Sequence, residues 1–164
     1  MDNIKYENWE GIIPNIISLN QKQIELLQKK ICLKFLFEKK CDFLDLYKQY
    51  IMNNEKILNK NQFTVQKTIT QLLLSYLNIS KEELLYLDWD GFKNVDEISV
   101  KDFLDNFENI WYESSDDLTI YDENAEWIIS IYHFGVVSFT LCPSLLTRPQ
   151  TVFGDAYENI NYKR

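Results

Sequence analysis

The segment DDLTIYDENAEWIISIYHFGVVSFTLC, which runs from Asp116 to Cys142, constrains the architecture of this chain more than any other. It is the only long segment dense in Ile, Val, Trp, Tyr, Phe and Thr, the residue types that favour β-strands. Two turn signals, Asp122–Ala125 and Phe134–Gly135, cut it into lengths that suit single strands. The segment therefore predicts three short antiparallel strands joined by two tight turns.

The upstream part of the chain carries helical signals instead. Apolar residues recur there at three- and four-residue spacing, most clearly over residues 20–40 and 99–112. Asn20, Ser80 and Ser99 are each followed three residues later by Gln or an acid, which is the pattern of a helix start. We therefore expect helices after each of these three residues.

Together these signals predict an α+β fold. A chain of 164 residues can bury a substantial core in one domain without staples, so we expect a single domain over residues 1–164. Residues 1–112 would be mainly helical, residues 116–142 would form the antiparallel sheet, and residues 143–164 would be a packed irregular tail. In this prediction the helical N-terminal two-thirds packs on a C-terminal three-stranded antiparallel β-meander.

The cysteines and the hydropathy pattern bear on the compartment. Cys32, Cys41 and Cys142 are odd in number and too far apart for a CxxC motif, so we expect reduced thiols. The first residues lack the basic start and apolar run of a signal peptide, and no run of 18 apolar residues occurs. We expect a cytoplasmic protein with no membrane partner.

Charge is distributed unevenly along the chain. The net charge is −8, yet residues 81–126 alone hold 15 Asp and Glu against three Lys, a balance of −12. Such a concentration repels nucleic acids and anionic membranes and attracts cationic partners. We therefore expect no nucleic-acid partner, and we interpret residues 81–126 as an acidic binding segment.

The residues that usually carry catalysis are sparse. His133 is the only histidine, it follows apolar residues on its face of the predicted strand, and no nucleophile can be placed beside it. The four glycines are isolated, so no phosphate-binding loop is present. We predict a protein that is not an enzyme, with no catalytic residue, no metal ligand and no cofactor.

One stretch resembles known proteins. Residues Asp117 to Asp122, a short turn, and residues Trp127 to His133 are similar to the C-terminal hairpin of small bacterial proteins, among them immunity proteins of contact-dependent or polymorphic toxin systems. The resemblance implies a bacterial, single-domain antidote without catalytic activity. Many of the toxins in such systems are basic nucleases, and an acidic face can block a basic active site.

Our leading hypothesis is an immunity-type protein that binds and neutralises a cognate basic toxin domain, with a nuclease among the candidates. Electrostatic attraction would set the association rate, and aromatic contacts would set the lifetime of the complex. We expect a monomer or weak dimer. The candidate contacts come from the acidic segment and the hairpin edge: Asp88, Trp89, Asp90, Asp105, Glu108, Asp116, Asp117, Asp122 and Glu123.

Two alternatives stay open at this point. The first is an interaction or regulatory domain with a partner that is not a toxin. The second is a hydrolase that depends on carboxylates and a metal, because paired acids such as Asp88 with Asp90 can bind Mg²⁺ or Ca²⁺ or act as acid and base. Paired carboxylates also occur by chance in an acidic protein.

Overall fold

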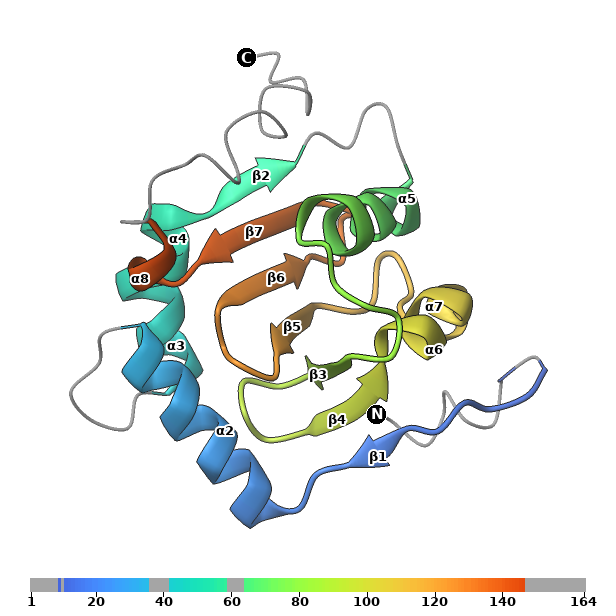
Figure 1. The fold of residues 1–164 in the computed structure, drawn as a ribbon, viewed down its shortest axis with the longest axis horizontal. Helices are drawn as coiled ribbons and strands as arrows, with labels where there is room; N and C mark the ends of the chain where they lie inside the picture. The colour runs from blue at the N-terminus through green and yellow to red at the C-terminus, as the bar shows by residue number, and fades with distance from the viewer. Residues whose placement is uncertain (1–8, 10, 36–41, 59–63, 147–164) are drawn as a thin grey trace.

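A seven-stranded antiparallel sheet is the centre of the molecule (Figure 1). The computed structural model describes residue 9 and residues 11–35, 42–58 and 64–146. The strand order is β1-β4-β3-β5-β6-β7-β2, and every neighbouring pair is antiparallel. The strands are β1 (Ile17–Ser18), β2 (Lys56–Leu58), β3 (Leu84–Asp88), β4 (Val95–Ser99), β5 (Leu118–Asp122), β6 (Trp127–Ile131) and β7 (Val137–Leu141).

The expected fold, a three-stranded meander under a helical N-terminal two-thirds, is therefore wrong. The strands β5, β6 and β7 do form a meander, but it is the middle of a larger sheet to which the N-terminal part adds four strands. The clearest misreading is β3, which follows the helix-start signal at Ser80. Leu85 and Leu87 are buried whereas Leu84 is exposed, a period of two that suits a strand between two partners. Pairing with β4 and β5 overrides the local helix signal.

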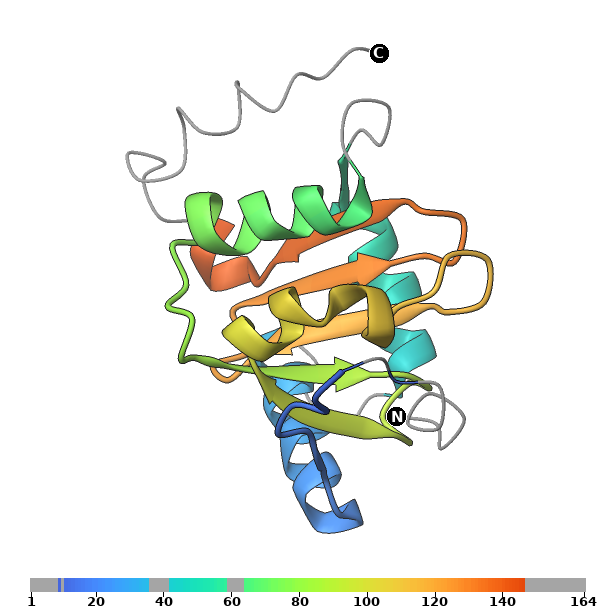
Figure 2. The ribbon, with the colours of Figure 1, turned by 90° about the vertical axis from the view of Figure 1, so that its right-hand side faces the viewer.

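Helices cover both faces of the sheet. In Figures 1 and 2, α2, α3 and α4 lie on one side of the sheet, and α5, α6 and α7 lie on the other. The helices are α2 (Gln21–Lys34), α3 (Phe43–Leu46), η1 (Tyr47–Ile51), α4 (Met52–Asn54), α5 (Val65–Thr70), η2 (Gln71–Tyr76), α6 (Val100–Asp105), α7 (Phe107–Ile110) and α8 (Pro143–Leu146). The arrangement is three layers, with the sheet in the middle.

Local capping signals fix several helix starts. The side chain of Asn20 accepts a hydrogen bond from the Gln23 amide, and the Gln23 side chain accepts one from the Asn20 amide, which is a complete capping box. Ser99 caps α6 in the same way by accepting from the Asp102 amide. These two predicted starts are confirmed. Of the predicted irregular tail, the first four residues form α8, and residues 147–164 lie outside the described part of the chain.

The two faces of the sheet differ in polarity. Directly paired residues point to the same face, so the register places Leu87, Ile120, Ile129 and Phe139 in one buried apolar row. Phe139 contacts the ring of Tyr76 in η2, which assigns this row to the side of α5 to α7. Part of the apolar core therefore lies beneath those helices.

The opposite face carries a buried polar row. Its members, one from each of β3, β5, β6 and β7, are Asp88, Thr119, Ser130 and Ser138. Two residues along from Thr119, Tyr121 stacks on Phe92, which in turn meets Phe43 of α3 edge to face. This polar row therefore lies beneath the α3 side of the molecule.

The cysteines differ from the expectation of reduced thiols. Cys32 is disulfide-bonded, whereas Cys142 is a free, buried thiol.

Within the described residues, no helix has both the length and the apolar character needed to cross a membrane.

Candidate functional site

The nine predicted contact residues are dispersed: Asp105 and Glu108 lie in α6 and α7, and the other seven lie at two opposite ends of the sheet. Asp88 is paired with Thr119 and Leu85 with Asp122, because β3 and β5 are antiparallel. The acids that precede β5 therefore share one end with Asp88, while Asp122 and Glu123 lie at the other. The acidic segment does not gather these nine residues on one face.

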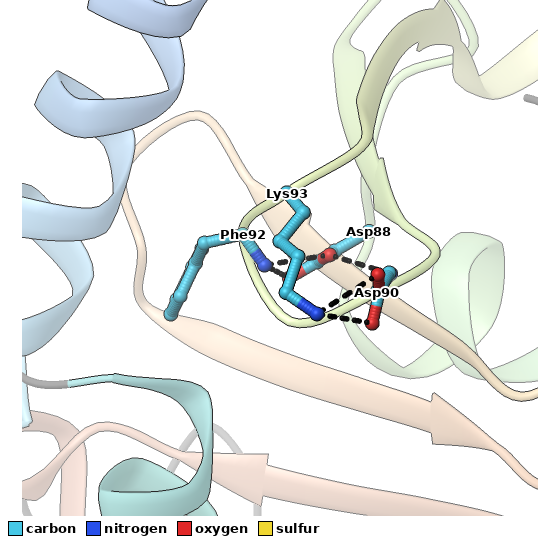
Figure 3. A network of polar contacts seen from close by, with 4 residues as sticks. All are labelled: Asp88, Asp90, Phe92 and Lys93. Atoms are coloured by element: carbon cyan, nitrogen blue, oxygen red, sulfur yellow. Dashed lines mark hydrogen bonds and ion pairs between the residues drawn. The ribbon is translucent and has the colours of Figure 1, made fainter.

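Asp88 is an internal residue, and Figure 3 shows its contacts with Asp90 and Phe92 in the β3–β4 turn. It is only 2% exposed and accepts hydrogen bonds from the amides of Asp90 and Phe92 and from the hydroxyl of Tyr121. Burial raises the pKa of Asp88 to about 6, although these hydrogen bonds act in the opposite direction. Its carboxylate also holds Phe92 in a left-handed conformation, with φ of 67°. Asp88 organises the β3–β4 turn from within.

The neighbours of Asp88 are also engaged inside the protein. The indole Nε1 of Trp89 donates to the carboxylate of buried Asp96 at 2.9 Å. Asp90 is exposed and lies 3.1 Å from Nζ of Lys93, and Figure 3 shows the ion pair. Of these turn residues, Asp90 alone presents a largely exposed carboxylate.

Asp122 caps the turn between β5 and β6. Its two carboxylate oxygens accept from the amides of Asn124, Glu126 and Trp127 at 2.6 to 3.1 Å. Burial raises the pKa of Asp122, and these hydrogen bonds oppose the shift. The turn signal in the sequence is confirmed, and the acid in it stabilises the turn.

Glu123 lies beside a small cavity on the α2 side. Lys30 donates to the backbone carbonyl of Glu123, and both residues line a cavity of about 250 Å³ together with Tyr86 and Glu97. This cavity holds a lysine as well as two acids. It therefore lacks the one-sided charge that the sequence-based hypothesis requires.

The remaining candidates lie in α6 (Asp105), in α7 (Glu108) and in the loop before β5 (Asp116 and Asp117). Asp105 pairs with Lys101 one helical turn earlier, at 2.9 Å. Asp116 accepts a hydrogen bond from the Tyr112 amide, and its own carbonyl accepts from the indole of Trp111. Asp117 accepts from both the amide and the ring Nδ1 of His133, at 2.7 and 2.9 Å. Asp116 therefore closes the loop of residues 112–117 on Trp111 and Tyr112, and Asp117 joins the loop to His133.

A larger cavity opens beside this loop, and we call it the acidic-aromatic cavity. Its volume is about 610 Å³, within the range of common ligand sites. It lies where the start of α5, the α7 helix with the loop that follows it, and the β6–β7 turn meet. Its lining consists of Thr64, Val65, Gln66, Phe107, Glu108, Trp111, Tyr112, Glu113, Phe134 and Gly135.

The cavity is built by contacts between segments far apart in sequence. Ser114 donates its amide to the carbonyl of His133, which joins the loop of residues 112–117 to the β6–β7 turn. Gly135 has φ of +77°, and a Cβ placed there would lie 3.1 Å from Oε1 of Glu113 and 3.8 Å from Val65. A glycine at position 135 therefore leaves room for the Glu113 carboxylate beside the β6–β7 turn.

Two carboxylates and two exposed aromatic rings define the chemistry of the cavity. Glu108 and Glu113 are exposed, and no Lys or Arg of the described residues forms an ion pair with either. Phe134 is 51% exposed and stacks on Tyr132, and Tyr112 is 36% exposed. No lysine or arginine lines the cavity. Such a site attracts a cation that also has an apolar or planar part.

Sequence reasoning found part of this site. Among the nine predicted contacts, Glu108 lines the cavity and Asp116 and Asp117 lie in the adjoining loop. It missed Glu113 and Phe134, because their proximity depends on how the loop meets the β6–β7 turn. A signal for Glu113 in the sequence was the run of residues 108–117, which holds four acids and no lysine or arginine.

Side chains that could bind a metal ion do not cluster in the described part of the chain. No three side chains of His, Cys, Asp or Glu lie close enough there to hold a metal ion. His133 is exposed, and its ring Nδ1 lies 2.9 Å from the Asp117 carboxylate.

Comparison with known proteins found no matching family model, no matching curated protein and no matching solved structure.

Proposed function

We propose that this chain is a non-catalytic binding protein that captures a basic protein through the acidic-aromatic cavity and the loop of residues 112–117. The observation that carries the proposal is the cavity itself, in which Glu108 and Glu113 have no ion-pair partner among the described residues. Unpaired carboxylates beside exposed rings favour a cationic partner.

The partner that we propose is a cognate basic toxin domain, and neutralisation would follow from blocking its active surface. The resemblance of residues 117–133 to immunity proteins supports this choice, and the net charge of −12 over residues 81–126 agrees with it. The contact surface that we propose lies at one end of the sheet, where Glu108 and Glu113 line the cavity. Asp88 and Asp122 are left out of it because their carboxylates already serve the interior and a turn.

A second partner class uses the same surface. A regulatory protein with a basic face would meet the same carboxylates and rings, so the geometry fits it equally well. Gene context separates the two classes, because an immunity gene should lie directly beside a toxin gene. We therefore propose co-expression of the full chain with the product of the adjacent gene, scored by rescue of growth and by co-purification.

The binding surface is tested by matched charge removal. In the Glu108→Gln/Glu113→Gln variant we expect the association rate with the co-purified partner to fall about tenfold at low salt and to depend less on ionic strength. The control is Glu25→Gln/Glu123→Gln, which removes the same charge from exposed residues away from the cavity. Equal slowing in both variants would show that total charge, and not this cavity, attracts the partner.

A further inference from the structure

The acidic-aromatic cavity has the chemistry of a receptor for a guanidinium group, and we infer that it receives an arginine side chain of the basic partner. This inference rests on the proposed function, which supplies the partner. It adds the identity of the recognised group and the residues that contact it.

The first argument is charge. Glu108 and Glu113 both line the cavity, and the lining contains no basic side chain. Neither carboxylate has an ion-pair partner within the described residues, in contrast to Asp90, which pairs with Lys93, and Asp105, which pairs with Lys101. The cavity therefore presents two negative charges that the described chain does not compensate, and a cation from outside would supply the balance.

The second argument is the shape of the recognised group. A guanidinium is planar, stacks on aromatic rings and donates two parallel hydrogen bonds to a carboxylate, whereas an ammonium is a compact point charge. Half of Phe134 and a third of Tyr112 are exposed in the cavity region, so ring surface is offered beside the carboxylates. Rings and carboxylates together favour arginine over lysine.

The third argument is preorganisation. The Phe134 ring is held against Tyr132 at 5.4 Å in a stacked arrangement and meets His133 edge to face at 5.1 Å. The loop that carries Glu113 is fixed to the β6–β7 turn by the hydrogen bond from Ser114 to His133. A ring and a loop backbone that are already in place lose little entropy on binding.

The probe for this inference is a pair of blocked tripeptides, Ac-Gly-Arg-Gly-NH2 and its lysine analogue, with a citrulline analogue as the uncharged isostere. Each is titrated into the full-length protein, and the amide resonances of Glu113 and Gly135 are followed by NMR. We expect the arginine peptide to shift both resonances with a dissociation constant on the order of millimolar. The lysine peptide should bind at least threefold more weakly, and the citrulline peptide should leave both resonances unchanged.

Two variants assign the contacts. Glu113→Gln and Phe134→Leu should each weaken the arginine peptide about five- to tenfold, while Glu123→Gln at the other end of the sheet should not change its affinity. Phe134→Leu keeps an apolar side chain, so a loss there reports the aromatic ring. Native amide spectra away from the site show that each variant folds.

The outcomes separate this inference from the proposed function. Equal binding of the arginine, lysine and citrulline peptides, or no shift at Gly135, would overturn the arginine inference. Partner association that still depends on Glu108 and Glu113 would then leave the proposed function standing. Arginine-selective binding with no capture of any basic protein would overturn the proposed function and remove the partner as the source of the arginine.

Discussion

The hydroxyl of Tyr121 donates a hydrogen bond of 3.0 Å to the carboxylate of Asp88, across the β3–β5 pair and inside the protein. Both side chains are almost fully buried. The bond joins the polar row of the sheet to the β3–β4 turn, since Asp88 also accepts from the Phe92 amide. It shows how an acid from the most acidic part of the sequence became part of the interior.

Asp88 should make the stability of the protein depend on pH. Its pKa is about 6 in the folded protein, above the ordinary value of 3.8, because burial disfavours the charge. A raised acid pKa means that its stabilising contribution is complete below pH 3.8 and is lost as the pH rises through about 6. The loss is about 3 kcal/mol. The unfolding free energy of Asp88→Asn relative to the wild type should therefore rise by that amount between pH 3.8 and 7, as measured by urea denaturation.

The comparison with Asp88→Asn cancels the titration of the other acids, which both proteins share. Identical pH profiles for the two proteins would contradict the internal role of Asp88. The companion variant Tyr121→Phe removes one donor from the carboxylate and should destabilise the protein by about 1–3 kcal/mol at pH 7. Its cost should be smaller at pH 4, where Asp88 is largely protonated.

Asp122 should be a structural residue of the β5–β6 turn. Asp122→Ala leaves the amides of Asn124, Glu126 and Trp127 without their acceptor and should lower the unfolding free energy by about 2 kcal/mol. The neighbouring Glu123→Ala changes an exposed side chain and should stay within about 0.5 kcal/mol of the wild type. Chemical denaturation of the two variants checks this, and comparable costs would argue against the turn-capping role.

Gly135 should be needed for both stability and the shape of the cavity. In Gly135→Ala an alanine backbone would have to keep φ near +77°, and its methyl group would lie 3.1 Å from Oε1 of Glu113. We expect a loss of about 1–2 kcal/mol from the left-handed backbone and a displaced Glu113 side chain. Gly11→Ala is the control, because its φ is +94° but a methyl group there meets nothing within 4 Å of the described structure.

A loss at position 11 as large as that at position 135 would show that backbone strain alone explains the effect. The measurement is the midpoint temperature of thermal unfolding of each of the two variants, compared with the wild type. The amide resonance of Glu113 reports separately whether its carboxylate has moved.

The cysteines should differ in reactivity. Cys142 is free and fully buried, so a thiol reagent should modify it slowly in the native protein and completely after unfolding. Peptide mapping without reductant should find Cys32 in a disulfide-linked peptide. Rapid modification of Cys142 in the native state, or recovery of Cys32 as a free thiol from air-oxidised protein, would contradict the structure.

Local signals in the sequence predicted local structure well. The cap at Asn20, the cap at Ser99 and the turns at Asp122 and Gly135 are all present, because each depends on residues a few positions apart. The meander β5-β6-β7 was predicted for the same reason, since tight turns join its strands. Elements that form through neighbouring residues are readable from composition and spacing.

Pairing between strands far apart in the chain could not be predicted from the sequence. Leu84–Asp88 follows a helix-start signal and becomes a strand because β4 and β5 flank it, and Lys56–Leu58 pairs with β7 about 80 residues away. Such short strands have little preference of their own, and the partner that stabilises them is absent from the local sequence. The structure therefore has a sheet of seven strands where the sequence predicted three.

The sequence by itself determined the net charge of −8, its concentration in residues 81–126, and the caps and turns that depend on neighbouring residues. Only the tertiary structure decided which of those acids face solvent. It buried Asp88 beneath Tyr121 and left Glu108 and Glu113 beside Phe134 in a cavity. The physical reason is that charge adds up along a chain, whereas burial and pairing depend on which distant segments fold against one another.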